Sequence, residues 1–274
     1  MMRLKSFPVA FKLVENNEDI SEILFMGRGI RYPISYAGAE TDVTHAFPAA
    51  YSGEDQIEKL RGNDNRLLLG VTGGIASGKS TVATMLEELG APIIDFDVLS
   101  RVVVEPGKPA LKEIVSYFGE QVLLDDGTLD RKRLSEIVFR DIEKRKKLES
   151  FIHPRIGEEF TKLVHQYTSQ DPEAIIQVVI PLLIEVNMQP IFHKVLMVYI
   201  PEEEQIKRLI ERDNITREMA QNMLKSQLPI EEKKGYADFV IDNSGSIEET
   251  RRQVEQLMEK LRAIQADSNG WQTS

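Results

Sequence analysis

The sequence predicts an α/β fold in which a five-stranded parallel sheet lies between two layers of helices. From residue 67 onward, short apolar runs alternate with amphipathic stretches, and this alternation is typical of parallel strands joined by helical crossovers. The first apolar run is followed directly by a glycine-rich turn and a helical pattern, which is the local order of a phosphate-binding α/β unit. The five predicted strands are LLLGV, APIIDF, AIIQVVIPLL, KVLMVYI and DFVID.

Composition changes near residue 66, and we place a domain boundary there. Residues 1–66 include a glycine- and tyrosine-rich segment, GRGIRYPISYAGAE, and a polar stretch, YSGEDQIEKLRGNDNR, without a clear hydrophobic period. We interpret residues 1–66 as an N-terminal extension of unknown role, either a small accessory module or a poorly ordered segment. The α/β domain is expected to span residues 67–265, followed by a polar tail at residues 266–274 that frays from the last helix.

Two helices can be predicted together with their starting signals. One is expected over residues 153–168, with Pro154 in its first turn and an apolar stripe that faces the core. The last helix is expected to begin at the segment SIEE, where the Ser246 hydroxyl can cap the helix and the Glu249 carboxylate can reach back. One side of this helix carries the apolar residues Val254, Leu257, Met258 and Leu261.

Composition also restricts the class of function. The 274-residue chain has a net charge of −10 at pH 7, so we expect no nonspecific binding to nucleic acid or to an anionic membrane. The chain contains no cysteine, which excludes disulfides, thiolate catalysis and zinc held by sulfur. Its most apolar run, residues 175–186, is too short for a membrane span. No signal peptide is recognised, and a cytoplasmic location is expected.

The segment LLLGVTGGIASGKST matches the pattern G-x-x-x-x-G-K-[ST] through Gly73, Gly78, Lys79 and Ser80. Glycines allow the backbone to curl so that amide groups point inward, and the helix expected over residues 80–89 adds the positive end of its dipole. Lys79 is expected to reach the β- and γ-phosphates of ATP, and the Ser80 hydroxyl to help hold a bridging Mg²⁺. The alternative is a glycine-rich turn with an incidental lysine. The predicted nucleotide-binding residues are Gly73, Gly74, Ile75, Ala76, Ser77, Gly78, Lys79, Ser80 and Thr81.

A pair of aspartates follows the second predicted strand in the segment IIDFD. Because side chains two residues apart on a strand share a face, Asp95 and Asp97 are expected to project together beyond the carboxyl end of the sheet, where ligands bind. Phosphoryl transfer needs a carboxylate there to orient the accepting hydroxyl or to hold water on magnesium. We assign Asp97 to the hydroxyl and Asp95 to its support; alternatively, Asp95 caps the next helix.

Basic residues gather in the segment EEEQIKRLIERDNITRE, where Arg208 and Arg212 lie four residues apart on an expected helix and Arg217 follows. These arginines form either a solvated face, paired with Glu204 and Glu211, or a mobile lid that clamps the transferred phosphate. The sequence leaves both interpretations open.

The four histidines show no spacing typical of a metal site, so no metal other than nucleotide-bound Mg²⁺ is assigned. His153 either hydrogen-bonds a substrate or, beside the first turn of its helix, is a cap or a packed group.

Seven segments occur in a characteristic order: TGGIASGKST, IIDFDVLSRVVVEPG, LDRKRLSEIVF, LESFIHPRI, VVIPLLIE, RLIERDNIT and SQLPIEEKKGYADFVIDNSGS. Together they closely resemble the dephospho-CoA kinase family, and the resemblance covers residues 67–261. The first segment is shared by P-loop kinases in general, whereas the aspartate pair, EPG, HPRI and ADFVIDN in this order are more specific. The resemblance implies a P-loop three-layer sandwich with a helical acceptor-binding region at residues 105–155 and a lid.

The resemblance also implies transfer of the γ-phosphate of ATP to the ribose 3′-hydroxyl of dephospho-CoA, the last step of coenzyme A synthesis. The residues by themselves support only phosphoryl transfer, and they leave the oligomeric state open. Carried over by position, the resemblance implies nucleotide binding by residues 73–80, acceptor chemistry at Asp97, acceptor contacts near Arg131 and His153, and lid arginines Arg208 and Arg212. With Lys79, we take Asp97, Arg208 and Arg212 as the expected catalytic residues.

Three positions depart from the family pattern. Met223 stands where relatives commonly carry an arginine, four residues before Gln227, and Lys225 is a candidate substitute. Phe96 separates the two aspartates where a small residue is usual, and Ile184 replaces a common phenylalanine.

Two other functions stay open on the sequence alone. A P-loop kinase for a nucleoside, shikimate or gluconate would use the same phosphate-binding loop with another acceptor. A nucleotide-binding regulatory switch would use it while residues 1–66 recruit a partner. The aspartate pair and the arginine-rich segment favour catalysis, because a switch needs no carboxylate to orient an acceptor.

Overall fold

The computed structural model describes residues 60–62, 65–139 and 141–269. Most of the expected N-terminal extension, and residues 270–274 of the expected tail, lie outside the described residues. The first strand begins at Leu67, next to the boundary placed at residue 66.

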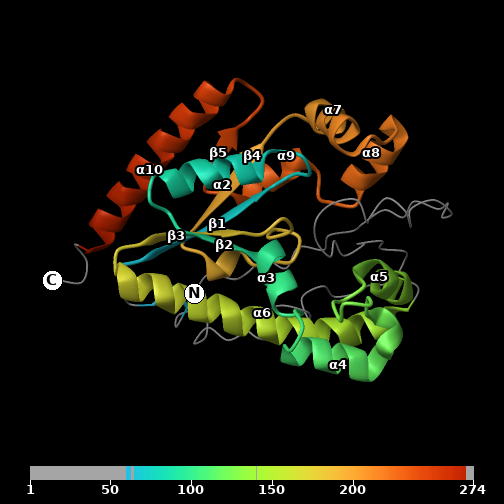
Figure 1. Ribbon diagram of the computed structural model, residues 1–274. Helices are drawn as coiled ribbons and strands as arrows, with labels where there is room; N and C mark the ends of the chain where they lie inside the picture. Colours follow the sequence, from blue (N-terminus) through green and yellow to red (C-terminus); the bar gives the residue numbers. More distant parts are fainter. Residues whose placement is uncertain (1–59, 63–64, 140, 270–274) are drawn as a thin grey trace, which may run out of the picture.

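Five parallel strands form one sheet, as the sequence predicts (Figure 1). Their spatial order is β2-β3-β1-β4-β5, so β1 is central and pairs with β3 on one side and β4 on the other. The loop after β1 therefore leaves the middle of the carboxyl edge, at the switch point where open α/β sheets bind ligands. The strands are β1 (Leu67–Gly73), β2 (Ile93–Asp95), β3 (Ile175–Val179), β4 (Lys194–Tyr199) and β5 (Phe239–Asp242).

All seven residues of β1 are buried, because helices cover both faces of the sheet. Leu68 packs into one hydrophobic cluster, and Leu67, Leu69 and Val71 pack into the other, as the period of two along a strand requires. One face is covered by α2 (Lys79–Glu88) and α10 (Ile247–Asn269), and the other by α3 (Phe96–Val102) and α6 (Ile142–Gln170). The three-layer prediction is confirmed.

Two helical bodies extend beyond this sandwich. In Figure 1, α7 and α8 lie at the upper right and α4 and α5 at the lower right, beyond the same end of the sheet. Their bounds are α4 (Pro109–Phe118), α5 (Arg131–Phe139), α7 (Glu202–Asp213) and α8 (Arg217–Lys225), and a short helix, α9 (Ile230–Lys233), leads into β5. Three 3-10 turns complete the described elements: η4 (Glu120–Val122), η5 (Gln189–Ile191) and η6 (Lys234–Tyr236).

The helix expected over residues 153–168 is much longer, and its predicted start was wrong. α6 has 29 residues and begins after Asp141, whose carboxylate accepts hydrogen bonds from the backbone amides of Glu143 and Lys144. Pro154 lies inside α6, where it removes one backbone hydrogen bond. The buried face of α6 offsets this loss, since Ile152 and other apolar residues on both sides of the proline pack into the core.

The start of α10 agrees with the prediction. Ser246 Oγ accepts a hydrogen bond from the Glu249 amide at 3.2 Å, and Glu249 Oε2 accepts one from the Ser246 amide at 2.8 Å. The predicted apolar side of the helix is buried against α2 and the sheet. α10 continues to Asn269, so residues 266–269 are helical. None of the helices in the described part of the chain has the length and hydropathy of a membrane span.

Candidate functional site

Residues 74–78 connect β1 to α2 as a tight loop at the centre of the carboxyl edge. Gly78 has φ 86° and Ala76 has φ 55°, so the backbone turns through the left-handed region twice before α2 begins at Lys79. A Cβ at Gly78 would also overlap the side-chain amide of Asn243. Glycine is therefore required at position 78 by both conformation and space. The helix expected over residues 80–89 is confirmed to within one residue at each end.

The loop brings an ammonium group and two hydroxyls to the N-terminus of α2. Lys79 Nζ lies 3.4 Å from the carbonyl oxygen of Gly73 and 3.3 Å from that of Gly74, so the lysine folds back over the loop. Ser80 and Thr81 lie exposed in the first turn of α2. The first-turn amides of a helix and its dipole favour anions, and a lysine beside them adds a full positive charge. This arrangement fits a nucleotide polyphosphate.

Two buried polar side chains that the sequence analysis did not assign brace this loop. A Cβ at Gly74 would overlap the Gln205 amide oxygen, and Asn243 Nδ2 donates a hydrogen bond to the Ser77 carbonyl at 2.8 Å. Gln205 and Asn243 are only 2% and 7% exposed. Their positions carry a weak signal in the sequence: each is polar, yet Gln205 falls on the buried face of a helix and Asn243 directly follows a strand.

The two aspartates do not alternate along a strand, so that part of the prediction was wrong. β2 ends at Asp95, α3 begins at Phe96, and Asp97 lies in the first turn of α3. Asp95 Oδ1 accepts hydrogen bonds from the amides of Asp97 at 2.7 Å and Val98 at 3.3 Å, which is the capping role kept as its alternative. Asp97 is exposed beside the carboxyl edge. The strong capping preference of aspartate started the helix two residues earlier than the strand pattern suggested.

The expected acceptor residues Arg131 and His153 belong to one helical body. Arg131 is the first residue of α5, His153 lies within α6, and α5 packs against α6. Both side chains are half-buried. Because α6 starts at residue 142, His153 does not lie at the first turn of its helix, and the capping alternative for His153 was wrong.

α7 and α8 pack against each other around a small core of their own. Ile206, Leu209 and Ala220 are fully buried in it, and Met223 is 7% exposed. Met223, which departs from the family pattern, is therefore a packing residue of this pair of helices. Lys225, the candidate substitute, lies exposed at the end of α8.

Of the three arginines in this region, the structure places Arg208 beside the phosphate loop. Arg208 Nη2 donates to the Asn243 carbonyl at 2.9 Å, Nε donates to Glu204 at 3.1 Å, and Nη1 lies 3.8 Å from where a Cβ of Gly78 would stand. Arg212 makes two hydrogen bonds to Asp213, at 2.7 and 2.6 Å, which raise the pKa of its guanidinium.

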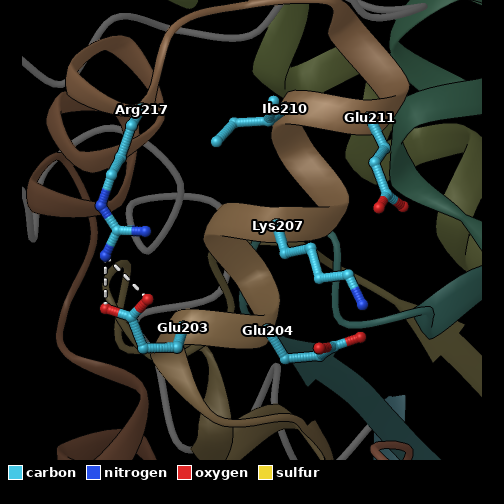
Figure 2. A pocket seen from close by; sticks show the side chains of 6 residues that line it. All are labelled: Glu203, Glu204, Lys207, Ile210, Glu211 and Arg217. Atoms are coloured by element: carbon cyan, nitrogen blue, oxygen red, sulfur yellow. Dashed lines mark hydrogen bonds and ion pairs between the residues drawn. The ribbon is translucent and has the colours of Figure 1, made fainter.

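Arg217 belongs to the outer face of the helix pair. Figure 2 shows its guanidinium directed at both carboxylate oxygens of Glu203, each at 2.7 Å. This pair lies in an open recess that none of the assigned site residues lines. The solvated-face alternative therefore describes Arg217, although its partner is Glu203 and not Glu204 or Glu211.

Within residues 60–62, 65–139 and 141–269, no group of three or more His, Cys, Asp or Glu side chains is arranged to hold a metal ion. A Mg²⁺ ion bound with ATP needs no such group, because phosphate oxygens and water supply most of its ligands. The exposed hydroxyl of Ser80 fits one protein ligand of such an ion.

Comparisons with known proteins agree with this geometry. A family model described as dephospho-CoA kinase matches residues 67–249. The dephospho-CoA kinase of Shouchella clausii is 47% identical over 192 residues, covering 70% of this chain and 97% of the relative. That of Listeria monocytogenes serovar 1/2a is 43% identical over 193 residues, covering 70% and 96%.

Two solved structures are similar to this chain in sequence and fold. The crystal structure of TT1252 from Thermus thermophilus has a TM-score of 0.60 at 33% identity and covers 72% of this chain and 98% of its own. The dephospho-CoA kinase from Campylobacter jejuni has a TM-score of 0.51 at 31% identity and covers 72% and 97%.

Proposed function

The chain belongs to the dephospho-CoA kinase family, and we propose on that premise that it transfers the γ-phosphate of ATP to the ribose 3′-hydroxyl of dephospho-CoA. The product is coenzyme A, so the reaction is the last step of its synthesis. The observation that carries this proposal is the phosphate loop, which combines Gly78, Lys79 and Ser80 at the centre of the carboxyl edge within a family match over residues 67–249.

The residues of the loop bind and orient the nucleotide. The amides of residues 73–80 hold the β-phosphate, and Lys79 turns from the loop carbonyls to the β- and γ-phosphates. Ser80 contributes its hydroxyl to Mg²⁺, which when bound neutralises charge on the phosphate oxygens. Arg208 stands closest to the loop among the lid arginines and stabilises charge on the transferred group, while Arg212 assists when the lid closes.

Asp97 orients the acceptor. The ribose 3′-oxygen forms a bond to the γ-phosphorus while the bond from that phosphorus to the β–γ bridging oxygen breaks, and the hydroxyl proton passes to Asp97 or to solvent. Asp95 supports this geometry by fixing the start of α3. Arg131 and His153 contact the acceptor from the α4–α6 body. The net charge of −10 disfavours nonspecific binding to nucleic acid and to anionic membranes.

A panel of acceptors tests the proposal. ADP release is followed with dephospho-CoA, a nucleoside, shikimate and gluconate, and coenzyme A formation is confirmed by mass. Coenzyme A itself is the matched negative acceptor, because its 3′-hydroxyl already carries phosphate. We expect turnover with dephospho-CoA alone. Preference for another acceptor would overturn the substrate assignment, and ADP release independent of any acceptor would favour the regulatory switch.

A further inference from the structure

Asn243 lies where four parts of the fold meet. It directly follows β5 and is 7% exposed. Its backbone amide donates to the Tyr199 carbonyl of β4 at 2.8 Å, and the Thr250 hydroxyl of α10 donates to its side-chain oxygen at 2.9 Å. Thr250 is fully buried, and its hydroxyl also lies 3.2 Å from the Ser246 carbonyl. A hydroxyl can donate or accept, so it is the Ser77 carbonyl, which can only accept, that requires the nitrogen end of the Asn243 amide to face the phosphate loop.

The nitrogen end of that amide holds the loop. Asn243 Nδ2 donates to the Ser77 carbonyl at 2.8 Å, in a buried contact between residues 166 positions apart in the sequence. The same nitrogen occupies the space that a side chain at position 78 would need. A carbonyl held from outside the loop in this way leaves the amides of the loop available for phosphate.

The backbone of Asn243 holds the lid arginine. Its carbonyl accepts from Arg208 Nη2 at 2.9 Å, and Arg208 Nη1 lies 3.8 Å from the Cβ position of Gly78. One residue therefore touches the loop through its side chain and the arginine through its main chain. A shift of Asn243 would therefore displace both the phosphate loop and Arg208.

We propose that Asn243 is a positioning residue for ATP, which sets the phosphate loop and Arg208 in one fixed geometry and is itself held in place by Thr250. The inference rests on the proposed function in that ATP is the nucleotide. Aspartate could not replace Asn243, because it has no donor for the Ser77 carbonyl and would place a negative charge beside the phosphates.

Three variants and one matched control test this role in the full-length chain. Asn243→Asp and Asn243→Ala remove the donor, and Thr250→Val removes the hydroxyl that hydrogen-bonds to the amide oxygen. The control is Gln253→Ala, because Gln253 also joins α10 to the end of β5, through two hydrogen bonds to the backbone of Asp242. If Asn243→Asp does not fold, Asn243→Ala and Thr250→Val carry the test.

The readouts are the Kd for ATP with Mg²⁺ by calorimetry, the KM for each substrate, and the melting temperature. We expect Kd and KM for ATP to rise about tenfold or more in Asn243→Ala, further in Asn243→Asp, and about threefold in Thr250→Val, as loss of a buried hydrogen-bond partner predicts. The KM for dephospho-CoA should stay within about twofold, and Gln253→Ala should bind ATP as the wild type does.

A purely structural role would lower the melting temperature and the active fraction while leaving Kd and KM unchanged, and that result would overturn the proposal. Equal losses of ATP affinity in Gln253→Ala and Asn243→Ala would also overturn it. The Kd for ATP tests Asn243 without any acceptor, so a failure of dephospho-CoA as substrate would be seen separately in the wild type.

Discussion

At the scale of single residues, the ammonium group of Lys79 is already positioned beside the phosphate loop. The ammonium lies over the loop through two long contacts to carbonyl oxygens, at 3.3 and 3.4 Å. Such contacts between a charge and a neutral oxygen are weaker than contacts to phosphate, so an arriving nucleotide can displace them at little cost.

Replacing the lysine tests this arrangement. Lys79→Ala should lower kcat about a hundredfold or more, because it removes the preorganised positive charge that stabilises the phosphate during transfer. The melting temperature should hardly change, since the hydrogen bonds from the ammonium to the two loop carbonyls are long and only partly buried. The measurement is ADP release with dephospho-CoA as acceptor. Unchanged turnover would remove the nucleotide site from this loop.

Substitutions of the two aspartates should distinguish a loss of catalysis at Asp97 from a loss of helix capping at Asp95. Asp97→Asn should lower kcat about a hundredfold, because an amide orients the acceptor hydroxyl less well and cannot take its proton. Asp95→Asn should change both activity and stability little, since an amide oxygen can still cap α3, whereas Asp95→Ala should cost about 1 kcal/mol of stability. Turnover and urea unfolding measure the two effects. Full activity in Asp97→Asn would show that the assignment to Asp97 is wrong.

Protonation of His193 should make the stability of the fold depend on pH. Its Nδ1 accepts a hydrogen bond from the Leu68 amide at 2.9 Å, and burial, with added repulsion from Arg61 and Arg66, lowers its pKa from 6.5 to about 4. The folded state therefore prefers the neutral ring. Its contribution to stability is fully present above pH 6.5 and is lost as the pH falls toward 4, by up to about 3 kcal/mol.

A variant isolates this effect from other titrations. His193→Asn keeps an acceptor for the Leu68 amide but cannot be protonated. Urea unfolding between pH 4 and 7 should show a shallower loss of stability in the variant than in the wild type. Parallel curves for the two proteins would exclude His193 as the cause.

At the scale of elements, α9 is short, yet a buried ion pair fixes it to the core. Lys233 is fully buried, and its Nζ contacts Glu185, which follows β3, and the Gln227 amide oxygen at 3.3 Å. Glu185 also accepts from the Leu228 amide. The segment that follows α8 is thereby joined to the loop after β3. In the sequence, Glu185 is visible only as an interruption of an apolar run. Its pairing could not be predicted, because Lys233 is 48 positions away.

A double-mutant cycle tests this connection. Lys233→Met should destabilise the fold by about 3–5 kcal/mol, because it leaves the Glu185 carboxylate buried without its counter-charge. Adding Glu185→Met should recover a large part of that loss, since two apolar side chains of similar volume can pack there. Chemical unfolding measures the cycle. Additive effects of the two substitutions would show that the pair is not coupled.

The elements also show what the sequence can and cannot predict. Four of the five strands fall within the predicted apolar runs, and β1 continues two residues past its run, LLLGV, to Gly73. The signal is clearest for β1 and β3, because burial on both faces leaves a continuous apolar run. The start of α6 was missed because Pro154 resembles a first-turn proline, and only the packing of the helix shows that it continues through it. Asn243 and Gln205 were missed for another reason. Their role depends on contacts with a distant loop, and no local pattern contains those contacts.

At the scale of the whole molecule, the α/β core extends slightly beyond the boundary at residue 66. Leu60 is 5% exposed and packs into the same hydrophobic cluster as Leu68. Arg61 donates to the Phe192 carbonyl at 2.8 Å, and Arg66 donates to the Leu60 carbonyl at 2.7 Å. These contacts reach the segment that carries His193 and enters β4.

Truncation at two points should therefore give different stabilities. A chain beginning at Asn65 loses the Leu60 side chain from the core and the Arg61 hydrogen bond, which together should cost about 2–4 kcal/mol of stability. A chain beginning at Glu58 keeps both interactions and should unfold at a higher temperature. Both should keep the wild-type KM for ATP, because the contacts of Leu60 and Arg61 lie beside the starts of β1 and β4, whereas the phosphate loop leaves the opposite edge of the sheet. Equal melting temperatures for the two chains would show that residues 58–64 add nothing to the core, and loss of activity in both would place part of the catalytic machinery in residues 1–57.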